Sequence, residues 1–269
     1  MADPTNSANP CSEIVLFSTS MKQATAHIRQ LEQLDSLRAE IHLECPPAAR
    51  PEPGQFVLAD LGSNDSAERP RSGAEGVSCY YLLQPIFPRR LEPGGFTFET
   101  DLAAAARLQP GSRLDLLGPV GCAARPPGSA RNLLLVHAVP GPLRLLPLAL
   151  DFLTRSGAVA LLFSQPDAPL AGLPDEFEIL RGPLETHLPE TLAWADVVYI
   201  DAPTEQLDRL RQALAQARPY ADAVPAYALI APPMPCGVGA CGVCAVRTRK
   251  GWRHACTDGP LFSISDLEL

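Results

Sequence analysis

The sequence predicts a β plus α/β fold made of an N-terminal antiparallel β-barrel, a small parallel α/β domain and a C-terminal cysteine segment. Short apolar runs broken by turn residues occupy the first part of the chain, which is the pattern of a barrel. Continuous apolar runs that alternate with helix candidates follow, as in a parallel sheet covered by helices. Four closely spaced cysteines lie near the end of the chain.

Residues 1–12 are polar and are predicted to form a flexible lead, and residues 13–126 are predicted to form the barrel. Its strand candidates are short apolar runs bounded by turn signals. These runs are Ala26–Ile28, Ala39–Leu43, Gln55–Leu58, Cys79–Leu83, Phe96–Phe98 and Arg113–Leu117. The stretch 63–76 is rich in Ser, Asn, Asp and Gly and is predicted to be a loop.

Residues 127–228 are predicted to form the α/β domain. Three apolar runs are typical of strands that are buried on both faces of a sheet. They are Leu133–Val136, Ala158–Phe163 and Val197–Ile200. The helix candidates are Leu143–Arg155 and Gln206–Ala217, the second of which follows Pro203-Thr204 as a candidate N-cap. Its residues Leu207, Leu210 and Leu214 share one helical face.

Residues 229–269 carry Cys236, Cys241, Cys244 and Cys256, which is the spacing of a plant-type 2Fe-2S site. Glycine, alanine and valine fill the loop between the first three thiols. Gly237, Gly239 and Gly242 allow the backbone to turn with positive φ and to approach inorganic sulfide closely. Two alternatives remain, a structural zinc site with four cysteine ligands and a disulfide cage. Zinc loops more often contain two CxxC pairs, whereas this segment has one.

Composition excludes some classes of protein. The chain has 269 residues, with 46% hydrophobic and 19% charged residues, as in an ordinary globular protein of two small domains and an appendage. Its net charge of −8 argues against a nucleic-acid partner. No N-terminal stretch has the pattern of a signal peptide. The most apolar run, Leu133–Leu153, contains three prolines and Arg144, so no membrane span is expected.

The other cysteines are scattered singly along the chain. They are Cys11, Cys45, Cys79 and Cys122. Isolated cysteines fit a reducing cytoplasm, which is the expected location. Cys122 becomes a candidate ligand only if the plant-type order of the other four fails.

Four stretches carry a resemblance to a known family. They are Pro53–Val57, Leu108–Gly111 leading to Leu117–Gly121, the cysteine loop, and Cys256–Phe262. With them the chain resembles the electron-transfer subunit of NAD-linked dihydroorotate dehydrogenase, within the ferredoxin reductase superfamily. The cysteine loop and its CTDGPLF tail are the specific part, whereas PGQF and LGPVG, with Gly118, occur across the superfamily.

The resemblance implies FAD in the barrel, NAD(H) on the second domain and a 2Fe-2S cluster that relays electrons. It also implies a hetero-oligomer with an FMN-containing subunit that oxidises dihydroorotate in pyrimidine biosynthesis. The physical logic is that NADH delivers a hydride, a flavin splits the electron pair, and a cluster carries single electrons across a protein interface.

The flavin motif of the superfamily, Arg-Pro-x-Ser, corresponds here to Gln84–Phe87, in which only Pro85 remains. Gln84 lacks the guanidinium that would bind a diphosphate, and Phe87 replaces a hydroxyl. Arg89 or Arg90 are candidate substitutes. The phosphate-binding Gly-x-Gly-Thr turn corresponds to Asp101–Ala104, where a carboxylate would repel a diphosphate.

The nucleotide motif is eroded in the same way. A glycine-rich turn after the first strand corresponds to His137–Pro142, in which Gly141 remains. A Cys-Gly-Pro signature corresponds to Asp201-Ala202-Pro203. His137 has no acidic or metal partner nearby in sequence, so a structural role is expected for it.

Two hypotheses follow from these motifs. In one, the protein is an iron-sulfur electron-transfer subunit that binds flavin through contacts the family does not use. In the other, it is a reductase-shaped relay or structural subunit that binds the cluster but neither flavin nor NAD(H), so reductase activity of its own is left open. Trp252, Arg253 and His254 either face a partner or form a hairpin whose tryptophan ring packs on the α/β domain.

Overall fold

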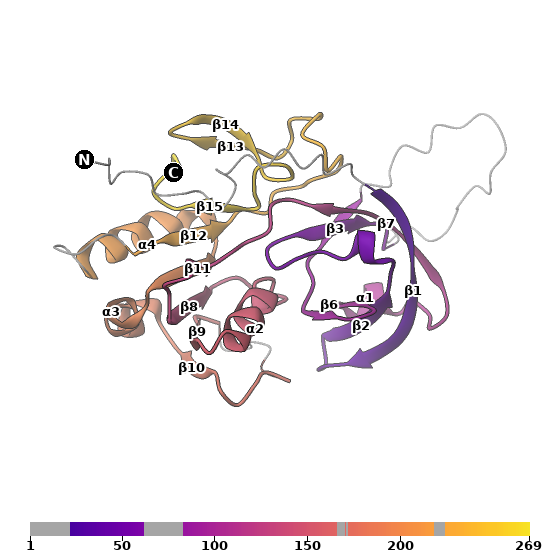
Figure 1. Ribbon diagram of the computed structural model, residues 1–269, viewed down its shortest axis with the longest axis horizontal. Helices are drawn as coiled ribbons and strands as arrows, with labels where there is room; N and C mark the ends of the chain where they lie inside the picture. The colour runs from indigo at the N-terminus through magenta and orange to yellow at the C-terminus, as the bar shows by residue number, and fades with distance from the viewer. Residues whose placement is uncertain (1–21, 62–82, 166–169, 171, 218–223) are drawn as a thin grey trace.

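The computed structural model describes residues 22–61, 83–165, 170, 172–217 and 224–269, and two β-sheets form most of this part of the chain (Figure 1). The predicted lead 1–12, the predicted loop 63–76 and most of the strand candidate Cys79–Leu83 lie outside the described residues. The proposed domain boundaries at residues 126 and 228 stay predictions.

The first sheet contains seven antiparallel strands in the order β4-β3-β7-β1-β2-β6-β5. Their bounds are β1 Lys22–Gln33, β2 Arg38–Glu44, β3 Phe56–Ala59, β4 Gln84–Ile86, β5 Arg90–Glu92, β6 Gly95–Asp101 and β7 Arg113–Val120. The two edge strands, β4 and β5, are joined by residues 87–89 alone. Such a link spans at most about 14 Å, so the sheet must curl to bring its edges together. This curled sheet confirms the predicted barrel-type architecture.

Alternation of buried and exposed side chains explains why these segments form strands. Along β7, Leu114, Leu116 and Val120 point into the protein, while Arg113 and Asp115 face solvent. Ile41 of β2 pairs with Phe98 of β6, and both are buried. The five strand candidates that lie fully within the described residues are confirmed. The sequence missed β4 and β5, which are too short to show a period.

The second sheet has the order β10-β9-β8-β11-β12-β15, and all of its pairs are parallel except β12 with β15. The strand bounds are β8 Asn132–His137, β9 Ala158–Phe163, β10 Glu178–Arg181, β11 Val197–Asp201, β12 Ala226–Leu229 and β15 Leu261–Ser263. The three apolar runs predicted as buried strands are β8, β9 and β11. Almost all of their residues are buried, as a sheet covered on both faces requires.

Helices α2 (Leu146–Thr154), α3 (Leu184–Trp194) and α4 (Thr204–Ala217) flank this sheet, with α2 on the side nearest the barrel (Figure 1). Both predicted helices are confirmed with shifted starts. The helix α2 begins three residues later than predicted, after the turn in which Leu146 N–H donates to the Leu143 carbonyl. The sequence missed α3 because Pro189 lies inside it. Two shorter helical segments are α1 (Leu102–Ala105) and the 3-10 turn η1 (Pro47–Ala49).

The C-terminal segment forms the hairpin β13 (Ala245–Thr248) and β14 (Gly251–His254) and then the strand β15. Because β15 pairs with β12, the segment is anchored to the α/β sheet. Its tail also contacts the barrel, since Gly121 N–H donates to the Cys256 carbonyl at 3.0 Å. No helix within the described ranges is long and apolar enough to cross a membrane.

Candidate functional site

The cysteine loop follows β12 and wraps tightly because three of its glycines have positive φ. The φ angles of Gly237, Gly239 and Gly242 are 67°, 73° and 69°. A side chain at these positions would be strained, so the sequence expectation for these glycines agrees with the backbone observed. The loop closes on the hairpin, where Ala255 N–H donates to the Cys244 carbonyl at 2.9 Å.

The four thiols are arranged as two pairs. The Sγ atoms of Cys244 and Cys256 are 3.2 Å apart, and the thiols of Cys236 and Cys241 are in hydrogen-bonding contact. All four are free thiols, so the disulfide cage that the sequence left open is not formed. Within the described part of the chain, no three His, Cys, Asp or Glu side chains converge on one metal-ion position.

Backbone amide groups point at these thiols. Gly239 N–H donates to Cys256 Sγ at 3.1 Å. Although burial opposes the shift, hydrogen bonds from the backbone of Cys241, Val238 and Ala240 lower the pKa of Cys236 to about 7. Burial and the neighbouring Cys244 raise the pKa of Cys256 to about 12. The loop can therefore stabilise negative charge on sulfur where the amide groups gather.

The site lies at the surface and has an apolar rim. Cys241 is exposed, whereas Cys244 and Cys256 are buried. The rim residues Val238 and Val243 of the loop are 50% and 54% exposed, and Trp252 of the hairpin is 66% exposed. The alternative in which the Trp252 ring packs on the α/β domain is therefore wrong. His254 N–H donates to Asp258 Oδ2 at 2.8 Å, which holds the hairpin against the tail.

The LGPVG turn of the barrel meets the CTDGPLF tail that begins at the last cysteine of the site. Cys122 N–H donates to the Gly259 carbonyl at 2.6 Å. A Cβ added at Gly121, where φ is 83°, would lie 2.8 Å from both the Gly259 oxygen and Pro260 Cδ. The LGPVG turn of the barrel therefore fits the CTDGPLF tail only because residue 121 has no side chain.

Most of the stretch that corresponds to the flavin motif makes contacts within the protein, in the β3–β4 pairing and in the core. Gln84 is exposed, Pro85 pairs with Leu58 in the sheet, and Gly118 is buried beside Val57. The Phe87 ring packs on Phe56 with centroids 5.1 Å apart.

The two arginines considered as substitutes are also engaged. The guanidinium of Arg89 is fully buried and lies 3.2 Å from Glu40 and 3.1 Å from Glu99. Arg90 donates to the Gly172 carbonyl. Burial raises the pKa of Glu99 against the lowering effect of Arg89.

Asp101 occupies the turn where the resemblance implies a phosphate. Its Oδ1 accepts a hydrogen bond from Ala104 N–H at 2.7 Å and so caps the first turn of α1. A carboxylate that caps a helix start uses the backbone donor and the dipole that would otherwise attract an anion.

The ends of β8 and β11 bring together residues that the sequence left apart. His137 pairs in register with Asp201, and His137 Nδ1 lies 3.6 Å from Asp201 Oδ2. Arg144 contacts the same carboxylate at 3.0 and 2.5 Å through Nε and Nη2. Although burial opposes the shift, the nearby His137 ring and the hydrogen-bonded Arg144 guanidinium lower the pKa of Asp201. His137 therefore has an acidic partner, Asp201, which lies far from it in sequence. The pairing could have been expected because the carboxyl ends of adjacent parallel strands lie side by side.

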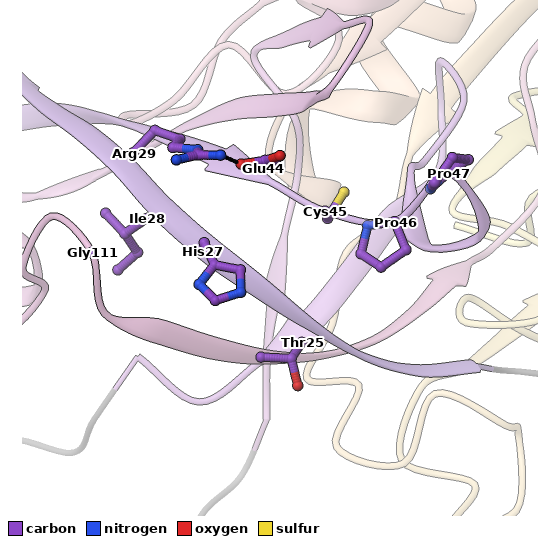
Figure 2. Close-up of a pocket in the computed structure, with 9 residues that line it drawn as sticks. All are labelled: Thr25, His27, Ile28, Arg29, Glu44, Cys45, Pro46, Pro47 and Gly111. Carbon is purple, nitrogen blue, oxygen red and sulfur yellow. Dashed lines mark ion pairs between the residues drawn. The ribbon is translucent and has the colours of Figure 1, made fainter.

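A cleft of about 350 Å³ remains between the two sheets, and it is lined mainly by the residues of the eroded motifs. Gln84, Phe87, Asp101, Pro140 and Arg144 all contribute to it. Gly141, with a φ of 110°, lies in the adjacent turn. A larger hollow of about 780 Å³ lies on the outer face of the barrel between Arg29, Glu44 and Gly111 (Figure 2). Arg29 and Glu44 form an ion pair across it, and it contains none of the predicted site residues.

Residues 232–268 match the family model described as the iron-sulfur cluster binding domain of dihydroorotate dehydrogenase B. The same region is similar to named electron transfer subunits of dihydroorotate dehydrogenase B (NAD+). A protein from Clostridium acetobutylicum is 48% identical over 46 residues, which are 17% of this chain and 19% of that protein. A Thermotoga maritima protein is 56% identical over 34 residues, 13% of this chain and 16% of that protein. The matches thus span less than a fifth of each relative.

The cysteine segment is also similar to a protein that is not named as a dihydroorotate dehydrogenase subunit. Sulfhydrogenase 1 subunit gamma of Pyrococcus furiosus is 47% identical over 34 residues, covering 13% of this chain and 12% of that protein. A segment similar to the cysteine segment therefore also occurs in a protein named as a sulfhydrogenase subunit.

Solved structures extend the likeness to the whole fold. The NADH-dependent reduced ferredoxin-NADP oxidoreductase matches with a TM-score of 0.68 and 18% identity, over 90% of this chain and 89% of that one. A ferredoxin reductase of carbazole 1,9a-dioxygenase matches with a TM-score of 0.54 and 18% identity, over 72% and 66%. The chain has a ferredoxin reductase-like fold, and its segment 232–268 matches an iron-sulfur cluster binding domain, so the resemblance predicted from the sequence is confirmed for that segment and for the fold.

Proposed function

We propose that this protein is an electron-transfer subunit in which Cys236, Cys241, Cys244 and Cys256 hold a 2Fe-2S cluster. The observation that carries the proposal is the arrangement of the thiols in two pairs, Cys236 with Cys241 and Cys244 with Cys256. Each iron of a plant-type cluster takes two thiolates, so two pairs suit two irons.

The same arrangement disfavours zinc. A structural zinc site needs four ligands around one point in a tetrahedron. The described residues offer no such single point, and the two pairs differ in burial, since Cys241 is exposed while Cys244 and Cys256 are buried. A site built for two metal ions with bridging sulfide accounts for the pairing better.

The surrounding backbone fits an anionic cluster. Gly239 N–H donates to a thiol, and the amide groups near Cys236 lower its pKa. Hydrogen bonds to cluster sulfur atoms tune the reduction potential. When bound, the cluster supplies transfer of one electron at a time. The protein residues hold it at an exposed apolar rim, where a partner can approach.

We further propose that the partner is a catalytic oxidoreductase subunit in a hetero-oligomer. The names of the relatives support a partner that oxidises dihydroorotate. From the resemblance we further infer that this partner carries FMN and acts in pyrimidine biosynthesis in the cytoplasm. The short shared segment also supports other partners of the same redox type, since a sulfhydrogenase subunit matches it as well.

A second candidate function is that of a relay without flavin or NAD(H) of its own. One observation favours it: Asp101 fills the helix start where the resemblance implies phosphate. Gln84 carries no charge for a diphosphate, and Arg89 is held by two buried glutamates. The residues present therefore do not fit FAD in the family manner, and no step of the proposed function depends on it.

Replacement of one ligand tests the cluster assignment. Cys241→Ser is expected to lower the iron and sulfide content of protein purified without oxygen and to change its visible spectrum, because serine is a poor ligand for cluster iron. Cys45→Ala, at a free buried cysteine of the barrel, is the matched control and should keep both contents. Unchanged iron and sulfide in the Cys241→Ser protein would refute the assignment, and stoichiometric zinc in a colourless wild-type protein would refute the cluster.

A further inference from the structure

The eroded motif positions are far apart in sequence, yet the fold brings them together beside the cleft between the two sheets, which Phe87 and Arg144 line. Phe87 stands in the flavin stretch, His137 in the nucleotide turn, and Asp201 in the last of the three motifs. Arg144, from the turn before α2, contacts both Phe87 and Asp201. The departures from the family pattern therefore form one connected structure.

Arg144 is the centre of this structure. Its Nε and Nη2 bind the two oxygens of Asp201, a bidentate geometry that fixes the guanidinium plane. The Asp201 side chain is 1% exposed, and His137, 2% exposed, lies 3.6 Å from it on the other side. Asp201 is thus a buried carboxylate between two basic side chains.

On the barrel side, Phe87 contacts the Arg144 guanidinium. The Arg144 Cζ atom lies 5.5 Å from the centroid of the Phe87 ring, within the range of a cation–π interaction. Phe87 and Phe56 belong to the hydrophobic core of the α/β sheet and not to that of the barrel. Aromatic residues of one sheet therefore complete the core of the other, and Arg144 closes over them.

Little space and little positive charge are left for a flavin. The remaining cleft, about 350 Å³, is at the lower end of the range for small-molecule sites. Glu99 and Asp101 also line it, while the guanidinium of Arg144 is neutralised by Asp201. A diphosphate in this cleft would meet two carboxylates and no cation free to bind it among the lining residues.

We propose that Phe87, Arg144, Asp201 and His137 form an interdomain latch beside the cleft that couples the two sheets in place of a bound flavin. The latch concerns the cleft and not the cysteine loop, so it stands or falls separately from the cluster. The latch extends the proposed relay function, because these residues would hold the two sheets together where a bound flavin would otherwise do so.

Flavin analysis and hydrogen exchange on the full chain test the latch. Wild-type protein purified without oxygen is expected to release no flavin on acid treatment and to leave the fluorescence of added FAD unquenched. Arg144→Gln should accelerate amide exchange about tenfold both in 84–92 of the barrel and in 137–145 of the α/β domain, since a lost charge-assisted hydrogen bond shifts opening by roughly that factor. Phe87→Leu, which keeps apolar volume, should act on the same two segments.

Arg155→Gln is the matched control because Arg155 forms an exposed pair with Asp151 on α2, and it should leave both segments unchanged. One flavin per wild-type chain would overturn the latch. Faster exchange confined to the α/β domain in both latch variants would overturn the coupling. Iron and sulfide measured on the same sample report on the proposed function alone: their absence refutes the cluster and leaves the latch standing.

Discussion

Arg89→Met should destabilise the barrel strongly because it leaves two buried carboxylates without their cationic partner. The Arg89 guanidinium lies 3.2 Å from Glu40 and 3.1 Å from Glu99, and the three side chains are 2%, 7% and 1% exposed. At an effective dielectric of about 20, each such pair contributes roughly 5 kcal/mol of attraction, which offsets the cost of burying the ions. Removal of one partner from a buried pair typically costs about 3–5 kcal/mol. Arg38 stays 3.7 Å from Glu99, so we expect about 3 kcal/mol.

The cost of Arg89→Met should also depend on pH. Burial already raises the pKa of Glu99, against the lowering effect of Arg89. A carboxyl whose folded-state pKa is raised favours the folded state at low pH and loses that contribution as pH rises through the folded pKa. Without Arg89 the pKa of Glu99 rises further. The destabilisation should therefore be full at neutral pH and become smaller toward acid.

Urea unfolding followed by circular dichroism measures this effect at neutral pH and in mild acid. Arg29→Met, which removes the exposed Arg29–Glu44 pair, is the control and should change the free energy of unfolding by less than about 1 kcal/mol. A triple variant, Arg89→Met with Glu40→Leu and Glu99→Leu, should recover most of the loss, since apolar replacement of a whole buried ion cluster is often neutral. A loss below about 1 kcal/mol for Arg89→Met alone, or no recovery in the triple variant, would refute the reasoning.

Three further predictions follow. Anaerobic addition of NADH to the isolated chain should leave the cluster spectrum unchanged while dithionite bleaches it, and bleaching by NADH alone would contradict the relay function. Gly121→Ala should cost about 1–3 kcal/mol and lower iron retention, because its Cβ would lie 2.8 Å from the Gly259 oxygen at a φ of 83°; iron content and urea midpoint equal to wild type would count against it. Because the pKa of Asp201 is lowered in the folded state, its contribution is present above the unfolded pKa and lost as pH falls through the folded pKa. Asp201→Asn should therefore flatten the acid limb of the stability profile, and an unchanged limb would exclude Asp201 as its source.

The parts of the molecule that the sequence predicted are those whose physics is local. Continuous apolar runs such as Ala158–Phe163 can only be buried strands or helices, and the structure contains β9 at those bounds. The cysteine spacing and its glycines are likewise readable within one loop, because positive φ and close thiols are set by neighbours in sequence. The helix α3 escaped prediction since Pro189 breaks its pattern, and β4 and β5 because three residues show no period.

The parts that the sequence missed depend on contacts between distant residues. Arg89 was a candidate flavin-binding arginine in the sequence, but it is buried and paired with Glu40 and Glu99 of the neighbouring strands β2 and β6. His137 looked unpartnered because Asp201 is far away in sequence, although the register of β8 and β11 sets them side by side. Strand register is a tertiary property that no single motif contains.

The proposed latch explains how a reductase-like fold could keep its shape without a bound flavin. A flavin between two sheets would contribute apolar contacts and neutralise cationic donors, so its loss alone would leave a void and unpaired charge. Phe87 supplies the apolar contact, Arg144 pairs with Asp201, and Asp101 caps the vacant helix start. Each of these departures from the family pattern alone would weaken a cofactor-binding motif. Together they provide contacts for the apolar surface and polar groups that an empty flavin site would expose. The cysteine loop shows no comparable replacement, because its four thiols are free and its three glycines keep their positive φ angles. We therefore interpret the cleft as stabilised by the protein's own side chains and the cysteine loop as suited to a bound cluster.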